Sequence, residues 1–344
     1  MPIHTVLGPI ASDELGPTSM HEHLWSDANA LRAAPREPYP DDSRVTIENL
    51  GFIRWNLLAL EDNLRLDDPA LAVRELEAVR ALGGAGVVDL TVDGLGERVE
   101  ALPAMARASG LHVMTGCGFY IGKTHPEWLR ELSVDAIAVL LADQLRSGIR
   151  ESGIRPALVG LIGTSDPIGE TEERVLSGAA RAATAVGASL NVRLDPSARH
   201  GLHVLDVAEV EGLTPERVIF GNVDEYLDPR YLLALAARGA VLELCFGSEA
   251  YYRDGYKDPT DADRLVHLAR LLEEGLDSQI VLGCSVWTKA QLRAYGGMGY
   301  DHLLRRIVPE LERTYGVPPA TVRQLMVDNP RRLLNRADDD GGTE

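Results

Sequence analysis

Two histidines separated by one residue are the first pattern in the chain that could do chemistry. His21 and His23 flank Glu22. Alternate residues of a β-strand share a face, so both imidazoles are expected to point one way and Glu22 the other. Two imidazoles on one face provide half of a metal site, or a general acid and a general base near neutral pH. The alternative is a purely structural role, in which both histidines lie in the core and hydrogen-bond to their neighbours.

The elements that position these histidines follow from the apolar pattern. Short runs rich in Val, Ile and Leu alternate with stretches of helical spacing, which is typical of parallel strands covered by helices. The predicted strands are residues 17–24, 85–92, 111–117, 157–163, 188–193, 217–222, 240–245 and 279–285. The predicted helices include residues 70–82, 134–146, 172–186, 229–237 and 261–274. Eight such units predict a (β/α)8 barrel, whose active site lies where the strands end.

Composition and charge limit the classes of partner that this barrel can bind. No linker divides the chain, so residues 1–336 are predicted to form one domain and the acidic residues 337–344 a disordered tail. The 34 Lys and Arg against 52 Asp and Glu give a formal net charge of −18 at pH 7, which opposes binding to nucleic acid or anionic membranes. We therefore expect a small-molecule substrate.

The expected compartment follows from three absences in the sequence. There is no apolar run of about 18 residues, so no membrane span is predicted. The N-terminus lacks the charged and apolar regions of a secretory signal. The cysteines, Cys117, Cys245 and Cys284, are odd in number and widely spaced, unlike a disulfide framework. A reducing, cytoplasmic location is expected.

Several sequence blocks occur in a characteristic order. They are Gly8-Pro9-Ile10, Glu14-Leu15-Gly16-Pro17-Thr18, Met20-His21-Glu22-His23-Leu24, Gly116-Cys117-Gly118-Phe119-Tyr120-Ile121-Gly122, Gly160-Leu161-Ile162-Gly163-Thr164-Ser165, Leu235-Ala236-Ala237-Arg238-Gly239, Tyr295-Gly296-Gly297 and Asn329-Pro330. From about Gly8 to Asn335 the chain resembles the phosphotriesterase family of the amidohydrolase superfamily. The resemblance implies a (β/α)8 barrel that hydrolyses phosphotriesters, lactones or similar esters with a hydroxide held between two metal ions.

The resemblance also implies six metal-ligand positions, of which this sequence matches two. His21 and His23 match the pair on the first strand. The positions of a bridging Lys or Glu, two His and an Asp hold Leu161, Arg193, Asn222 and Ser285. An apolar side chain cannot bridge cations, a guanidinium offers no acceptor, and a neutral amide is a poor ligand for a transition metal.

We therefore predict that the binuclear centre is lost and that no cofactor is needed. The alternative is a single zinc on His21 and His23 as a mononuclear remnant, with Cys245 or Cys284 as a soft ligand. Without metal, either histidine is available as a general acid or base.

The residues at the other strand ends predict a site that binds anions, in place of the cation-binding site that the resemblance implies. Arg193 is predicted to hold a substrate carboxylate or phosphate, or a developing oxyanion, unless it merely pairs with Asp224 or Glu225. The predicted catalytic residues are His21, His23, Arg193 and Asp224. The predicted substrate-binding residues are Tyr120, Asn222, Cys245, Cys284, Ser285 and Trp287.

Three functions remain open at this point. The leading hypothesis is an enzyme that acts on a small, anionic organic molecule by acid/base chemistry, such as hydrolysis, elimination, isomerisation or cyclisation. The first alternative is a non-catalytic pseudoenzyme that binds a metabolite or a partner protein. The second is a metal-dependent ester or lactone hydrolase with atypical ligands. Resemblance to relatives that are often dimers leaves a homodimer open.

Overall fold

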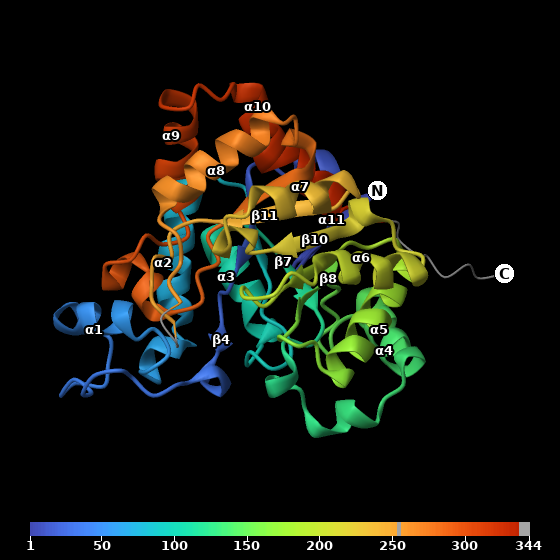
Figure 1. Ribbon diagram of the computed structural model, residues 1–344, viewed down its shortest axis with the longest axis horizontal. Helices are drawn as coiled ribbons and strands as arrows, with labels where there is room; N and C mark the ends of the chain where they lie inside the picture. Colours follow the sequence, from blue (N-terminus) through green and yellow to red (C-terminus); the bar gives the residue numbers. More distant parts are fainter. Residues whose placement is uncertain (253–255, 337–344) are drawn as a thin grey trace.

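The computed structural model describes residues 1–252 and 256–336 and contains a parallel sheet of eight strands surrounded by helices (Figure 1). The predicted tail, residues 337–344, lies outside the described residues. In sheet order the strands are β12 (Ile280–Gly283), β11 (Val241–Cys245), β10 (Val218–Gly221), β9 (Leu190–Arg193), β8 (Leu158–Gly163), β7 (His112–Cys117), β6 (Gly86–Asp89) and β3 (Thr18–Glu22). Each predicted strand is present, shortened at one or both ends. The (β/α)8 prediction is confirmed.

Helices connect consecutive strands. They are α2 (Pro69–Ala81), α3 (Leu102–Ser109), α4 (Val134–Ser147), α5 (Glu170–Val186), α6 (Gly201–Val210), α7 (Pro229–Ala237) and α8 (Asp261–Glu273). The five predicted helices are among them. Side-chain oxygens cap several helix starts: Asp68 accepts from the Leu71 amide and Ser133 from the Ala136 amide.

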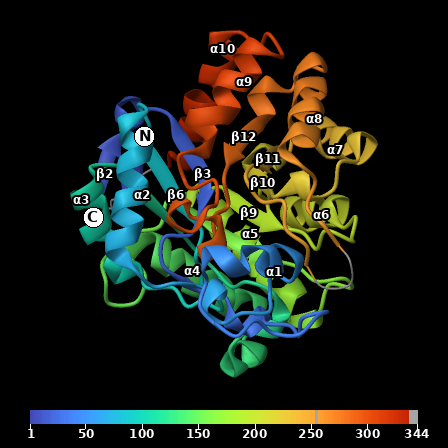
Figure 2. The ribbon, with the colours of Figure 1, turned by 90° about the vertical axis from the view of Figure 1, so that its left-hand side faces the viewer.

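Further elements extend the barrel at both ends of the chain. The hairpin of β1 (Pro2–Thr5) and β2 (Gly8–Ala11) and the pair β4 (Ser26–Asp27) and β5 (Arg65–Leu66) are antiparallel. The helices α9 (Val308–Arg313), α10 (Pro319–Arg323) and α11 (Asn329–Leu334) follow the last strand. The short α1 (Leu50–Trp55) lies well below α10 in both ribbon views (Figures 1 and 2). None of the helices in the described part of the chain combines the length and apolarity that a membrane crossing needs.

The apolar core has two layers. Strand residues such as Val87, Val113 and Leu282 pack outward against the helices. Residues of the opposite parity, such as Val88 and Met114, fill the inside of the barrel. The interior of the described barrel is therefore a packed core, and ligands of this fold bind at its carboxyl end.

The first and last strands are joined by a few hydrogen bonds at the barrel seam. The strands β3 and β12 stand at the two ends of the sheet order. The Ser285 amide donates to the His21 carbonyl at 2.8 Å, and the His23 amide donates to the Val286 carbonyl at 3.2 Å. The seam therefore runs through both histidines of the HxH pattern.

The side chain of Glu22 completes this seam from the outer face of the strand. Its Oε1 accepts from the Cys284 amide at 3.2 Å and from the Ser19 hydroxyl at 2.6 Å, and its Oε2 accepts from the Val286 amide at 3.1 Å. Glu22 is completely buried, and burial raises the pKa of its carboxyl from 4.5 to about 8. The prediction that Glu22 points away from the two imidazoles is confirmed, and its role is to close the barrel.

Replacing this carboxyl should change both the stability of the fold and its dependence on pH. Because the unfolded chain releases the Glu22 proton near pH 4.5 and the folded chain retains it to about pH 8, the free energy of unfolding should fall as the pH rises across this interval. Glu22→Gln should flatten this slope. It should also cost about 1–3 kcal/mol, because an amide NH2 cannot accept from a backbone N–H. Urea unfolding at pH 5.5, 6.5 and 8 measures both effects.

The matched control is Glu77→Gln, a change of the same type at an exposed position of α2. It should leave both the slope and the midpoint of unfolding as they are in the parent protein. An unaltered pH slope in the Glu22→Gln protein would show that this carboxyl does not carry the effect.

Candidate active site

A cavity of about 460 Å³ lies at the carboxyl end of the barrel strands. All ten residues predicted from the sequence line it: His21, His23, Tyr120, Arg193, Asn222, Asp224, Cys245, Cys284, Ser285 and Trp287. Residues from the segment before and after α1, including Leu31 and Leu58, also contribute to its wall. The fold therefore brings the predicted residues to one place, although lining a cavity does not by itself assign a role to each.

His21, which lines the cavity, forms a hydrogen-bonded pair with Glu243, which lies behind the lining residues. Nδ1 of His21 lies 2.5 Å from Oε1 of Glu243, and both side chains are fully buried. The other carboxylate oxygen accepts from Nδ2 of Asn191 at 2.8 Å. Within the described residues, Nε2 of His21 has no hydrogen-bond partner. The pair is thus a carboxylate-oriented imidazole whose second nitrogen remains available.

Glu243 was missed by the sequence reasoning, although a signal for it exists. In β11 the residues Val241, Glu243 and Cys245 alternate with Leu242 and Leu244, which pack in the outer core. A single carboxylate in an otherwise apolar strand must find a buried partner, because an unpaired charge is costly inside a barrel. The alternation places Glu243 on the inner face, where His21 is the partner.

His23 has a different environment from His21. Its Nδ1 lies 3.0 Å from the hydroxyl of Thr91, and the Thr91 amide in turn donates to Asp89. Burial lowers the pKa of His23 well below its usual value, and electrostatic interactions with His21 and Arg193 lower it further. His23 is therefore neutral at physiological pH, with Thr91 and Asp89 fixing its position.

Arg193 pairs with Glu225, one of the two partners considered from the sequence. Nη2 of Arg193 donates to both carboxylate oxygens, at 2.6 and 2.7 Å. Burial raises the pKa of Glu225 from 4.5 to about 7, and the guanidinium of Arg193 opposes part of this rise. The hydroxyl of Tyr256 donates to the Glu225 carbonyl, which links the loop after β11 to this ion pair. The guanidinium therefore stands in the cavity as a fixed cation.

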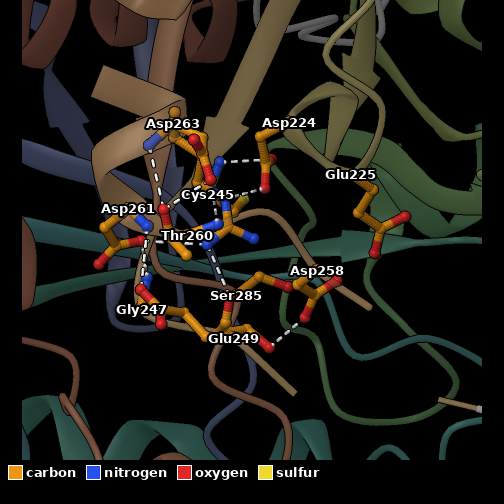
Figure 3. Close-up of polar contacts among 12 residues, drawn as sticks. Asp224, Glu225, Cys245, Gly247, Glu249, Asp258, Thr260, Asp261, Asp263 and Ser285 are labelled. Carbon is orange, nitrogen blue, oxygen red and sulfur yellow. Dashed lines mark hydrogen bonds and ion pairs between the residues drawn. The ribbon is translucent and has the colours of Figure 1, made fainter. Parts of the chain in front are cut away.

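Asp224 is engaged by the protein scaffold. Its Oδ1 accepts from the Cys245 amide at 2.7 Å, and its Oδ2 accepts from Nε of Arg264 at 2.8 Å (Figure 3). Arg264, on α8, is only 1% exposed and also contacts Asp261. Burial raises the pKa of Asp224, and the charge of Arg264 counteracts the rise. The predicted catalytic Asp224 thus ties β11 to α8 and does not contact Arg193.

The three cysteines are all buried, and burial raises the pKa of each thiol. Sγ of Cys284 lies 3.7 Å from the Tyr300 carbonyl, and Sγ of Cys117 lies 3.9 Å from the Leu158 carbonyl. Sγ of Cys245 lies 3.7 Å from Oε1 of Glu243. A raised pKa disfavours the thiolate, which argues against a cysteine nucleophile.

A metal ion needs several donor atoms at suitable distances from one another. In the part of the chain that the structure describes, His21, Glu243 and Cys245 form the one group of three donors whose ligand atoms lie within 4.8 Å of one another. Two ligands of a tetrahedral zinc, each at about 2.0–2.1 Å, lie roughly 3.3 Å apart. The 2.5 Å between Nδ1 of His21 and Oε1 of Glu243 is shorter than this and corresponds to a short hydrogen bond.

The other implied ligand positions hold side chains with different tasks. Leu161 packs in the inner core of the barrel. Asn222 and Ser285 have left-handed backbones, with φ of 53° and 47°. The Asn222 Oδ1 is buried without a hydrogen-bond partner among the described residues.

The sequence is similar to a known protein family and to several known proteins. The model of the phosphotriesterase family matches residues 1–334. The N-acetyltaurine hydrolase of Salmo salar is 31% identical over 340 residues, covering 96% of this chain and 97% of that protein. The corresponding human protein is 28% identical with the same coverage.

Solved structures agree with the fold. The resiniferatoxin-binding protein from Rhodobacter sphaeroides is 35% identical, with a TM-score of 0.92 and coverage of 97% of this chain and 95% of that chain. A lactonase from Listeria monocytogenes is 21% identical, with a TM-score of 0.79 and coverage of 97% and 99%, and supports the fold alone.

The buried pair of Asp224 and Arg264 should contribute to stability in a measurable way. Arg264→Leu is expected to lower the free energy of unfolding by about 3–5 kcal/mol, because it leaves the Asp224 carboxylate buried without its cation. Arg238→Leu is the control, because Arg238 pairs with Asp206 and Glu209 at the surface, where ion pairs stabilise little. Thermal and urea unfolding compare the two variants, and equal stability of both would refute the structural role assigned to Arg264.

Proposed function

The chain belongs to the phosphotriesterase family, and from this premise we propose that its cavity hydrolyses an ester or amide bond in a small organic molecule. The observation that carries the proposal is the pair of His21 and Glu243, with the second imidazole nitrogen left without a partner among the described residues. Relatives that hydrolyse N-acetyltaurine, an amide, support an acyl substrate for this chain.

The pair supplies a general base and then a general acid. With the proton of His21 on Nδ1 and donated to Glu243, the Nε2 atom accepts a proton from water while the water oxygen attacks the substrate carbonyl carbon. The carboxylate stabilises the imidazolium that forms. When the C–O or C–N bond breaks, the imidazolium returns this proton to the leaving alcohol or amine. The products are the carboxylic acid and the alcohol or amine.

Arg193 is proposed to stabilise the developing oxyanion. Its guanidinium is a permanent cation held in place by Glu225, so it needs no reorganisation during the reaction. The lining carries five Asp and Glu side chains against three Lys and Arg side chains, a balance that does not favour an anionic substrate. Charge that develops on the carbonyl oxygen is therefore a better match for Arg193 than a substrate carboxylate or phosphate.

The proposal includes no binuclear metal centre. Two of the implied ligand positions hold Leu161, which offers no donor atom, and Arg193, which repels cations. The short distance between His21 and Glu243 also supports a hydrogen-bonded pair rather than two ligands of one ion. These residues do not fit a pair of metal ions, so no step of the reaction is assigned to metal ions.

A second candidate function rests on the donor group around His21. The side chains of His21, Glu243 and Cys245 offer nitrogen, oxygen and sulfur within 4.8 Å, a set of atoms that zinc accepts. If Glu243 moves away from His21 by about 1 Å, the three side chains could hold one ion. The protein would then be a metal-dependent ester or lactone hydrolase with atypical ligands.

The catalytic role of Glu243 can be tested by one substitution. Glu243→Gln should lower kcat about 10²- to 10⁴-fold with little change in KM, because the imidazolium loses its carboxylate partner. The assay uses a panel of carboxylic esters, lactones and N-acyl amines. Glu77→Gln, on the surface of α2, should retain full activity. Unchanged hydrolysis by the Glu243→Gln protein would exclude the pair as the catalytic base, and binding without hydrolysis by the parent protein would identify a pseudoenzyme.

Chelation separates the two candidate functions. Activity that survives dialysis against a chelator, with less than one metal ion per chain left by mass spectrometry, is expected for the metal-free reaction. Activity that disappears on chelation and returns with zinc, but not in a Cys245→Ser variant, would establish the single-metal hydrolase instead. Cys117→Ser is the matched control, because Cys117 is equally buried and lies outside the donor group.

A further inference from the structure

One wall of the cavity is apolar and continuous with the inner core of the barrel. Nine residues belong both to the cavity lining and to this inner core or its border: Ala28, Leu31, Leu58, Leu95, Tyr120, Ile121, Leu161, Tyr252 and Trp287. Leu161 occupies the position where the family resemblance implies a group that bridges two metal ions. A polar floor is therefore replaced by an apolar one at the centre of the site.

Aromatic rings continue this wall toward the charged part of the cavity. The rings of Tyr252 and Trp287 are nearly parallel, with centroids 6.3 Å apart and an angle of 14° between their planes. The ring of Tyr256 follows at 5.7 Å from that of Tyr252. All three residues line the cavity. The three rings thus form one aromatic surface along the cavity, and aromatic surfaces favour offset stacking of another aromatic group.

Backbone hydrogen bonds hold this wall in place. The Trp287 amide donates to Oε1 of Gln291 at 3.0 Å, and the Tyr252 amide donates to the Tyr256 carbonyl at 2.8 Å. The hydroxyl of Tyr256 donates to the Glu225 carbonyl, beside the ion pair with Arg193. The backbone of Trp287 and of Tyr252 and the side chain of Tyr256 are therefore held in place, and Tyr256 reaches the residue that pairs with Arg193.

We propose that the substrate carries an aryl group that stacks on Trp287 and Tyr252 while its scissile carbonyl lies between His21 and Arg193. This inference rests on the hydrolase function proposed above and names the class of substrate for it. The cavity of about 460 Å³ is in the range of pockets that enclose drug-sized ligands. A substrate without a flat apolar part would leave the aromatic wall unoccupied.

Binding can be measured separately from hydrolysis with ketones, which the site cannot hydrolyse. The probes are 4-phenylbutan-2-one and 4-cyclohexylbutan-2-one, which have rings of similar size and the same carbonyl chain. Isothermal titration calorimetry should show about 2- to 10-fold tighter binding of the phenyl compound, as expected for one stacking contact. Equal affinities would overturn the inference.

Substitutions then locate the preference. Trp287→Leu should abolish the preference for the phenyl probe, and Trp287→Phe, which keeps a ring, should retain most of it. Trp55→Leu is the control, because Trp55 is 45% exposed, packs against Tyr251 and does not line the cavity. Circular dichroism melts establish that each variant is folded, and a preference that persists in folded Trp287→Leu contradicts the assignment.

A third probe tests the main competing ligand class. Aromatic faces also bind cations, and the lining carries more acidic than basic side chains. A ketone with a trimethylammonium group in place of the phenyl ring should bind more weakly than the phenyl probe. Tighter binding of the cationic probe would replace the aryl assignment with a cationic one. Aryl preference without any ester or amide hydrolysis would contradict the proposed function and leave the binding assignment intact.

Discussion

The position of the site depends on how the barrel is closed. The two strands at the ends of the sheet order meet through backbone bonds at His21 and His23 and through the carboxyl of Glu22, which accepts from the Cys284 and Val286 amides. The same dipeptide step that turns Glu22 outward to this seam turns both imidazoles inward. The alternation of side chains along residues 21–23 therefore both closes the barrel and orients the two histidines.

Three largely buried side chains that line the cavity are each held by a carboxyl group. Arg193 is held by Glu225, Arg264 by Asp224, and His21 by Glu243. Such pairing is required in a barrel mouth surrounded by apolar side chains, because an isolated charge there would be strongly destabilised. The three pairs differ in consequence. Arg264 and Asp224 anchor a helix, whereas the other two pairs hold Arg193 and His21 in the lining of the cavity.

The aromatic and apolar wall complements these pairs. Leu161 extends the inner core to the floor of the site, and Trp287 and Tyr252 continue it toward the ion pair of Arg193. A molecule that fills such a cavity meets an apolar surface on one part and fixed charges on another. This division is what orients a ligand, because apolar contacts provide affinity and a few polar groups fix the direction of its reactive bond.

The sequence by itself determined the eight strands, five of the helices and the strand ends that meet at the cavity, because buried parallel strands read as continuous apolar runs and their carboxyl ends share one edge. All ten predicted site residues line that edge. Only the tertiary structure decided which charged and polar side chains form pairs. His21 and Glu243 are 222 positions apart in the sequence. Asp224 and Glu225 are neighbours, yet Glu225 pairs with Arg193 and Asp224 pairs with Arg264. Such choices depend on distances and directions across the barrel, which no local pattern of residues encodes.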